Sequence, residues 1–132
     1  MADTKLSKLA TRFIEAWNSQ DVAQVLACYT DDVSYWDPGT RGEGVQGQDA
    51  LRRYLSRLFD AWKMHWSLRE VYALQEREGA AVLWRATLRK ASGGAAVEVN
   101  GMDLVLLAGD RIRRNDVYFD RAVLAPLLGS SS

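Results

Sequence analysis

The chain has 132 residues, enough for a sizeable hydrophobic core, and we predict one domain over residues 1–132. Its 17 basic residues balance its 17 acidic ones, so no overall field would attract nucleic acid or an anionic membrane. A single cysteine, Cys28, excludes an internal disulfide and favours a reducing compartment. Because no leader-like segment or run of membrane-spanning length occurs, we expect a soluble, cytoplasmic protein.

Apolar residues at helical spacing predict helices over residues 6–17, 22–29 and 51–62, with Asp21 and Gln24 forming a capping box before the second. A short apolar run at 33–36 lies between the second and third helices. From residue 64 the period changes to two, which predicts strands over 64–74, 80–89, 97–107 and 111–119. A short helix or turn over 120–128 and a disordered tail over 129–132 complete the chain. Helices followed by hairpin-linked strands indicate an α+β fold, with helices packed on one face of a mostly antiparallel sheet.

The stretch over residues 31–55 contains the first candidate for chemistry, Asp37, which directly precedes Pro38. Proline disfavours a helical backbone in the residue before it, so Asp37 should lie extended at the end of the short apolar run. A Gly-rich loop follows, and a fixed carboxylate beside such a loop and aromatic walls could form a small-molecule site. The alternative is an Asp-Pro turn with no further role.

Strand alternation identifies a second candidate, Asp103, as the only ionisable group in a row of otherwise apolar residues. A carboxyl group in that position must be hydrogen-bonded or protonated with a raised pKa, and both are typical of functional sites. The opposite face of this strand is also half apolar, so Asp103 could instead face solvent or a partner subunit. Asp116 shares a predicted face with Arg114, and the pair could simply hold strand register unless Asp116 reaches the cavity of Asp103. His65 could exchange protons near neutral pH, or be an ordinary surface residue.

Several other kinds of site lack their usual signatures. One histidine and one cysteine without zinc-type spacing argue against a metal centre. No P-loop motif occurs, and no G-x-S-x-G motif presents a nucleophilic serine. We therefore expect no metal and no cofactor.

The order of elements resembles the nuclear transport factor 2-like superfamily, which includes SnoaL-like polyketide cyclases and ketosteroid isomerase. Local similarity covers nearly the whole chain, in the phrases ATRFIEAWNSQDVAQVLACYTDDV, WDPGTRGEGVQGQDALRRYL and GDRIRRNDVYFD. The resemblance implies a cone-shaped α+β barrel in which three N-terminal helices pack on a curved, mostly antiparallel sheet around one pocket. It also implies a homodimer formed through the sheet.

By similarity to ketosteroid isomerase, Asp37 matches the general base and Asp103 matches the acid that polarises a carbonyl oxygen. Removal of a proton from the carbon beside a carbonyl group needs a base at the C–H and a hydrogen-bond donor at the oxygen. One ionised and one protonated carboxyl group can fill these two roles. The resemblance therefore implies an isomerase, cyclase or lyase acting on a small apolar or aromatic carbonyl compound. We expect a substrate pocket lined by aromatic side chains: Phe13, Trp17, Trp36, Tyr54, Phe59, Trp62, Trp66, Trp84 and Tyr118.

Two alternatives remain at this stage. Asp103, Arg114 and Asp116 supply the residue types of an epoxide hydrolase, which would add water to an epoxide. A non-catalytic ligand-binding or dimerisation module is the other, because Phe13 replaces the tyrosine that ketosteroid isomerase uses at its oxyanion site.

Overall fold

The computed structural model describes residues 3–128 and forms an α+β fold, as predicted. The tail predicted at 129–132 lies outside the described residues. The elements in chain order are α1 (Asp3–Ser19), α2 (Val22–Leu26), β1 (Tyr29–Trp36), β2 (Val45–Gln46), α3 (Gln48–Ala61), β3 (Trp62–Ala73), β4 (Gly79–Lys90), β5 (Val97–Ala108), β6 (Arg111–Tyr118), the 3-10 helix η1 (Arg121–Leu124) and α4 (Ala125–Leu128). None of the helices in this described part is long and apolar enough to cross a membrane.

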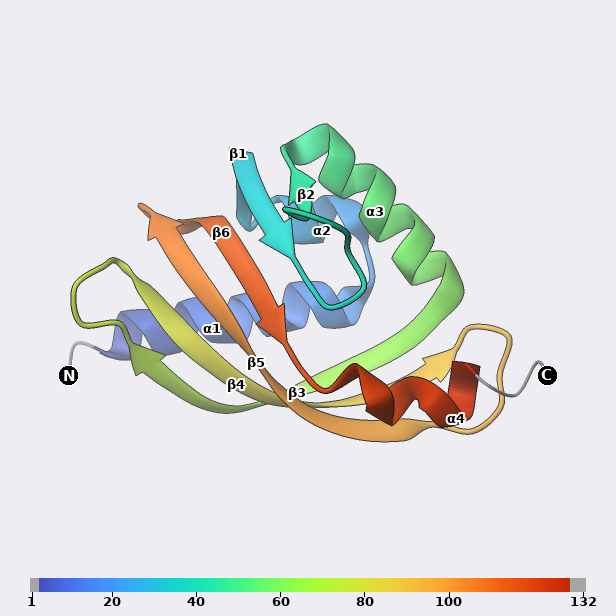
Figure 1. Ribbon diagram of the computed structural model, residues 1–132. Coiled ribbons are helices and arrows are strands. Elements are labelled where there is room, and N and C mark those ends of the chain that lie inside the picture. The colour runs from blue at the N-terminus through green and yellow to red at the C-terminus, as the bar shows by residue number, and fades with distance from the viewer. Residues whose placement is uncertain (1–2, 129–132) are drawn as a thin grey trace.

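The strands form one sheet in the order β2-β1-β6-β5-β4-β3. Neighbouring strands are antiparallel except β1 and β6, which run parallel. Figure 1 shows the long strands β3, β4 and β5 curving beneath α1 and α3, with α4 near one end of the sheet. The sheet thus forms a cone whose concave face is covered by the N-terminal helices.

Alternation along the strands fills this cone with apolar side chains. On β4 the inward residues Val82, Trp84 and Ala86 are almost fully buried, whereas Arg85 between them is exposed. The helices contribute their own apolar stripes, which include the buried residues Leu51 and Leu55 of α3. Asp21 caps α2, because its side chain accepts a hydrogen bond from the backbone N–H of Gln24. The reciprocal half of the predicted capping box is replaced, since the backbone N–H of Asp21 donates to Oγ of Ser19.

The end of α1 is fastened to the outermost strand, β3, by two side-chain amides. Asn18 donates to the carbonyl of Trp66 and accepts from its N–H, at 2.9 and 2.7 Å. Gln20 does the same between the carbonyl of Trp62 and the N–H of Met64, at 2.9 and 2.7 Å. These contacts fix the end of α1 against β3.

Several predicted boundaries were wrong. The second helix ends at Leu26, and Tyr29, predicted to be helical, begins β1. Trp62, predicted on the third helix, is the first residue of β3. Register irregularities also interrupt simple alternation, between Tyr29 and Ser34 in β1, between Leu68 and Glu70 in β3, and in β6 opposite Leu106 and Leu107.

The irregularity in β6 changes which residues share a face. Ile112 is buried, but Arg114 is exposed, although simple alternation placed both on one side. An extra residue in one strand shifts every later side chain to the other face. Consequently Asn115 and Val117 point toward the core, and Asp116 and Tyr118 point away from it.

Candidate active site

Asp37 and Asp103 both line one cavity between the helices and the concave face of the sheet. The cavity encloses about 80 Å³, several times the roughly 10–15 Å³ that one water molecule requires. The described residues that line it include no lysine, arginine or histidine: Phe13, Ile14, Trp17, Tyr35, Asp37, Leu58, Met64, Trp66, Trp84, Ala86, Leu88, Asp103, Val117 and Phe119. Two acids that lie 66 positions apart in sequence therefore share one apolar chamber.

Aromatic rings form a continuous wall of this cavity. Trp17 stacks on Tyr35 at a centroid distance of 6.0 Å and meets Trp66 edge to face at 5.5 Å. Trp66 contacts Trp84 at 6.4 Å, and Trp84 contacts Phe119 at 6.3 Å. Such packing gives a rigid apolar surface suited to a flat or compact organic molecule.

Asp37 directly follows β1 and is held by a tight turn. Its Oδ1 accepts a hydrogen bond from the N–H of Gly39 at 2.7 Å, and its backbone carbonyl accepts from the N–H of Thr40 at 3.0 Å. This is the local bonding that aspartate favours at turns, and it fixes the side chain at the end of the strand.

The other carboxylate oxygen of Asp37 accepts hydrogen bonds from two tyrosines. The hydroxyl of Tyr35 lies 2.8 Å from Oδ2, and the hydroxyl of Tyr54, from α3, also donates to Oδ2. Burial and the nearby Asp37 carboxylate raise the pKa of both phenols above the ordinary tyrosine value, so both remain protonated donors at neutral pH. Asp37 is thus a carboxylate that accepts bonds from three donors.

Asp103 lies on the inner face of β5 in a different environment. Its Oδ1 accepts from the indole N–H of Trp84 at 2.8 Å, and its Oδ2 accepts from the Nδ2 of Asn115 at 3.2 Å. Burial raises the pKa of Asp103 to about 7 despite these two donors, and the negative charge of Asp37 acts in the same direction. Asp103 is therefore largely neutral below pH 7.

A glycine allows Trp84 to reach Asp103. Gly101 is paired with Trp84 in the sheet, and a Cβ atom on Gly101 would lie 2.5 Å from Cη2 of the indole and 2.8 Å from the carbonyl oxygen of Tyr118. Any larger residue would displace the indole. Gly101 lies two residues before Asp103 in the alternating row of this strand, but its role depends on a contact that alternation does not reveal.

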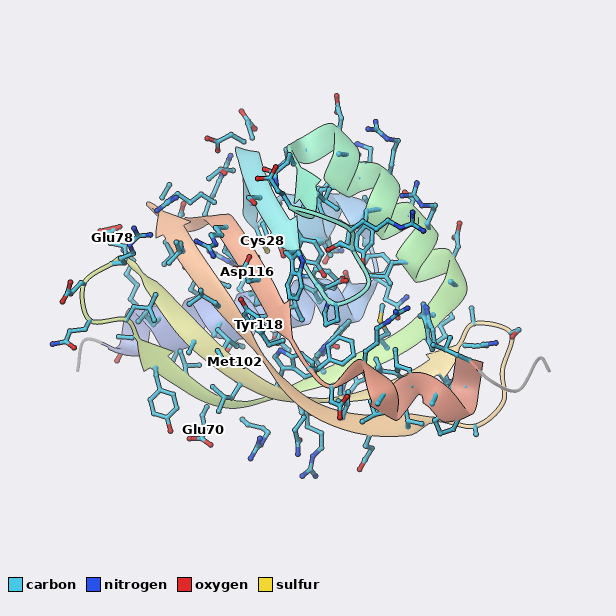
Figure 2. All side chains as sticks on the ribbon, in the orientation of Figure 1. Cys28, Glu70, Glu78, Met102, Asp116 and Tyr118 are labelled. Carbon is cyan, nitrogen blue, oxygen red and sulfur yellow. The ribbon has the colours of Figure 1, made fainter. Side chains whose placement is uncertain are left out.

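Several of the predicted site residues lie elsewhere. Trp36, Arg114, Asp116 and Tyr118 line a depression on the opposite face of the sheet. There Asp116 is ion-paired with Arg114 at 2.7 Å, and Figure 2 shows Asp116 and Tyr118 near Met102 on β5. Because Asp103 is paired with Val117 and Asp116 with Leu104, the two acids point to opposite sides of the sheet. The epoxide hydrolase arrangement of Asp103, Arg114 and Asp116 is not assembled.

Of the predicted aromatic walls, Phe13, Trp17, Trp66 and Trp84 line the cavity. Tyr54 contacts Asp37, and Phe59 packs edge to face behind Trp17 at 5.8 Å. Trp62, at the α3–β3 junction, does not line the cavity. His65 is exposed on the outer side of β3.

Sequence reasoning missed Tyr29, Tyr35 and Asn115. The predicted wall includes Trp36 but not its neighbour Tyr35, and it is Tyr35 that faces inward. Asn115 was hidden by the irregularity in β6, which reverses the faces of that strand. A buried asparagine next to a buried acid is a signal, but only once strand register is known.

Comparison with known proteins now places this geometry in a family. Residues 10–115 match the model of the SnoaL-like domain. A comparison with curated protein sequences found no match.

Solved structures share the fold at low sequence identity. A protein of ketosteroid isomerase-like fold from Catenulispora acidiphila, in complex with trimethylamine, superimposes with a TM-score of 0.79 at 14% identity, over 92% of this chain and 92% of that one. A ketosteroid isomerase-like protein from Erwinia carotovora atroseptica gives 0.67 at 22% identity, over 86% of this chain and 92% of that one. SalBIII, an epoxide hydrolase/cyclase-like enzyme of pyran ring formation in the polyether salinomycin, superimposes with a TM-score of 0.77 at 18% identity, over 91% of this chain and 94% of that one. With a family match over most of its length, the chain belongs to the SnoaL-like domain family.

Proposed function

We propose that the protein is an enzyme that moves a proton on a small, neutral, largely apolar carbonyl compound, as an isomerase, cyclase or lyase. The observation that carries this proposal is that two carboxyl groups line one aromatic cavity in different environments. Asp37 accepts three hydrogen bonds, whereas burial favours the neutral form of Asp103. The three donors to Asp37 suit an ionised base. Asp103 is neutral below about pH 7, which suits a donor to a carbonyl oxygen.

The chemistry follows from these two states. Removal of a proton from the carbon beside a carbonyl group leaves negative charge on the oxygen, and a positioned acid stabilises that charge where water is excluded. Asp37 would accept the proton, and neutral Asp103 would donate a hydrogen bond to the oxygen. The described lining contains no basic side chain, so a carboxylate or phosphate substrate would meet two acids without a compensating cation. This supports a neutral substrate.

Proton abstraction can be tested before the natural substrate is known. Neutral cyclic ketones and enones are incubated with the protein in D₂O, and deuterium incorporation beside the carbonyl is followed by NMR. Wild-type protein should catalyse exchange, and Asp37→Asn should slow it by about 100-fold or more, because general-base catalysis contributes at least that factor.

Asp116→Asn is the matched control, because Asp116 is as buried as Asp37, at 8% exposure each, but lies on the other face of the sheet. Exchange should survive this change. Equal exchange in wild type and Asp37→Asn would refute the mechanism. Ligands that raise the unfolding temperature of wild type and Asp37→Asn alike, without exchange in either, would indicate a binding module, the alternative that Phe13 favours.

We also propose that a second copy of the chain pairs with the outer face of the sheet, and that the protein works in the cytoplasm. The outer face carries exposed Tyr72 and Tyr118, at 55% and 46% exposure, which supports a contact there. The cytoplasmic location is supported by the single, free Cys28.

A further inference from the structure

A buried chain of hydrogen bonds leads from α1 to Asp103. The indole N–H of Trp17 donates to the hydroxyl oxygen of Tyr29 at 3.2 Å, and the Tyr29 hydroxyl donates to Oδ1 of Asn115 at 2.7 Å. Nδ2 of Asn115 then donates to Oδ2 of Asp103 at 3.2 Å. Tyr29 and Asn115 have no exposed surface, and Trp17 is 6% exposed, so water does not compete for these bonds.

The donor-to-acceptor direction of this series of hydrogen bonds is fixed at both ends. One end is a group that can only donate, and the other is a group that can only accept. An indole N–H only donates, so the Tyr29 oxygen must accept there and must send its single proton onward to Asn115. The carbonyl of Leu104 only accepts, and it lies 3.5 Å from Nδ2 of Asn115. Both constraints require the same orientation of the amide, with oxygen toward Tyr29 and nitrogen toward Asp103.

We propose that Asn115 is a positioning residue for Asp103, and that Trp17 and Tyr29 hold its amide with the nitrogen toward the acid. The inference rests on the proposed role of Asp103 as the acid. Trp84 and Asn115 place one N–H donor on each carboxyl oxygen, and neither donor can accept a proton in this orientation. The proton of neutral Asp103 must point away from both, and the open side is the cavity that Asp103 lines.

The same arrangement tunes how readily Asp103 releases its proton. Trp84 on β4 and Asn115 on β6 are neutral donors that favour the ionised acid, whereas burial and the charge of Asp37 on β1 oppose ionisation. Removal of the Asn115 donor therefore leaves the opposing effects in place. The ionisation midpoint of Asp103 should rise.

The test follows the carboxyl ¹³C resonance of Asp103 with pH in four proteins: wild type, Asn115→Leu, Tyr29→Phe and Asn18→Leu. Asn115→Leu should raise the midpoint by about one pH unit, the effect expected for one lost hydrogen bond to a charged group. Tyr29→Phe removes a single oxygen atom and should shift the midpoint in the same direction by less. Asn18→Leu is the matched control, because Asn18 also makes two amide bonds but bonds only to the backbone of Trp66. It should leave the midpoint unchanged.

The titration needs no substrate, so it separates this inference from the proposed reaction. A raised midpoint without any ketone exchange would support the positioning role and count against the chemistry. An unmoved or lowered midpoint in Asn115→Leu would overturn the inference. Should Asn115→Leu fail to fold, Tyr29→Phe decides, and an unmoved midpoint in that variant would overturn the anchoring by Trp17 and Tyr29. In an active protein, the upper pH limit of exchange should move with the midpoint.

Discussion

Replacement of Asp103 by asparagine should change how the stability of the protein depends on pH. The ordinary pKa of 3.8 is raised to about 7 in the folded protein. Between these values the folded state binds one proton more than the unfolded state, so stability is fully present below about pH 3.8 and is lost as pH rises toward 7. Asparagine at this position carries no charge and removes that dependence.

The magnitude follows from the width of this interval. Each pH unit is worth about 1.4 kcal/mol, so the interval from pH 5 to 7 corresponds to about 3 kcal/mol. The amide also has a constant cost of about 1–3 kcal/mol, because its NH₂ group must face one of two donors, Trp84 or Asn115. The free energies of unfolding of wild type and Asp103→Asn at one pH therefore do not test the ionisation of Asp103. The test is how the difference between these two free energies changes with pH.

Urea denaturation of wild type and Asp103→Asn from pH 5 to pH 8.5 measures that difference. Wild type should lose about 3 kcal/mol relative to the variant as pH rises through 7, after which the difference should become constant. Asp116→Asn controls for removal of a buried carboxyl group on the opposite face. Parallel curves for wild type and Asp103→Asn would show that Asp103 is already ionised at pH 5 and would refute the reasoning.

Two further changes test the packing and the outer face of the sheet. Gly101→Ala should destabilise the fold by about 2 kcal/mol in urea denaturation, because the new Cβ would lie 2.5 Å from Cη2 of Trp84. In a double-mutant cycle, Trp84→Phe should cost less in the Gly101→Ala background than in wild type, and strictly additive effects would contradict the clash. Tyr118→Glu should convert the proposed dimer to a monomer in sedimentation velocity, because it places a charge on the exposed sheet face; a wild-type monomer would refute that pairing.

The sequence predicted more of the fold than of the site. Helical and strand periods located the long elements, because each buries one face along its whole length. Asp37 and Asp103 could also be selected, since one precedes a proline at a strand end and the other interrupts an apolar row. Their meeting in one cavity needed the structure, because it depends on the curvature of a sheet that brings β1 and β5 together around β6.

The errors have local physical causes. One irregularity in β6 reversed the predicted faces of Arg114, Asp116 and Tyr118, and the same shift concealed Asn115. Alternation assigns two sets of residues to two faces, but it does not say which face is inside when both contain aromatic rings. Alternation alone therefore does not distinguish Trp36 from Tyr35, the residue that contacts Asp37.

The amides of Asn18 and Gln20 have an effect beyond joining α1 to β3. The outermost strand of a sheet has unpaired backbone N–H and C=O groups, which can pair with a strand of another molecule and so lead to aggregation. At Trp62, Met64 and Trp66 these groups are already occupied by side chains that imitate a neighbouring strand. The first half of the β3 edge is thereby closed to the addition of another strand. This lowers the tendency of the sheet to aggregate edge to edge through that segment.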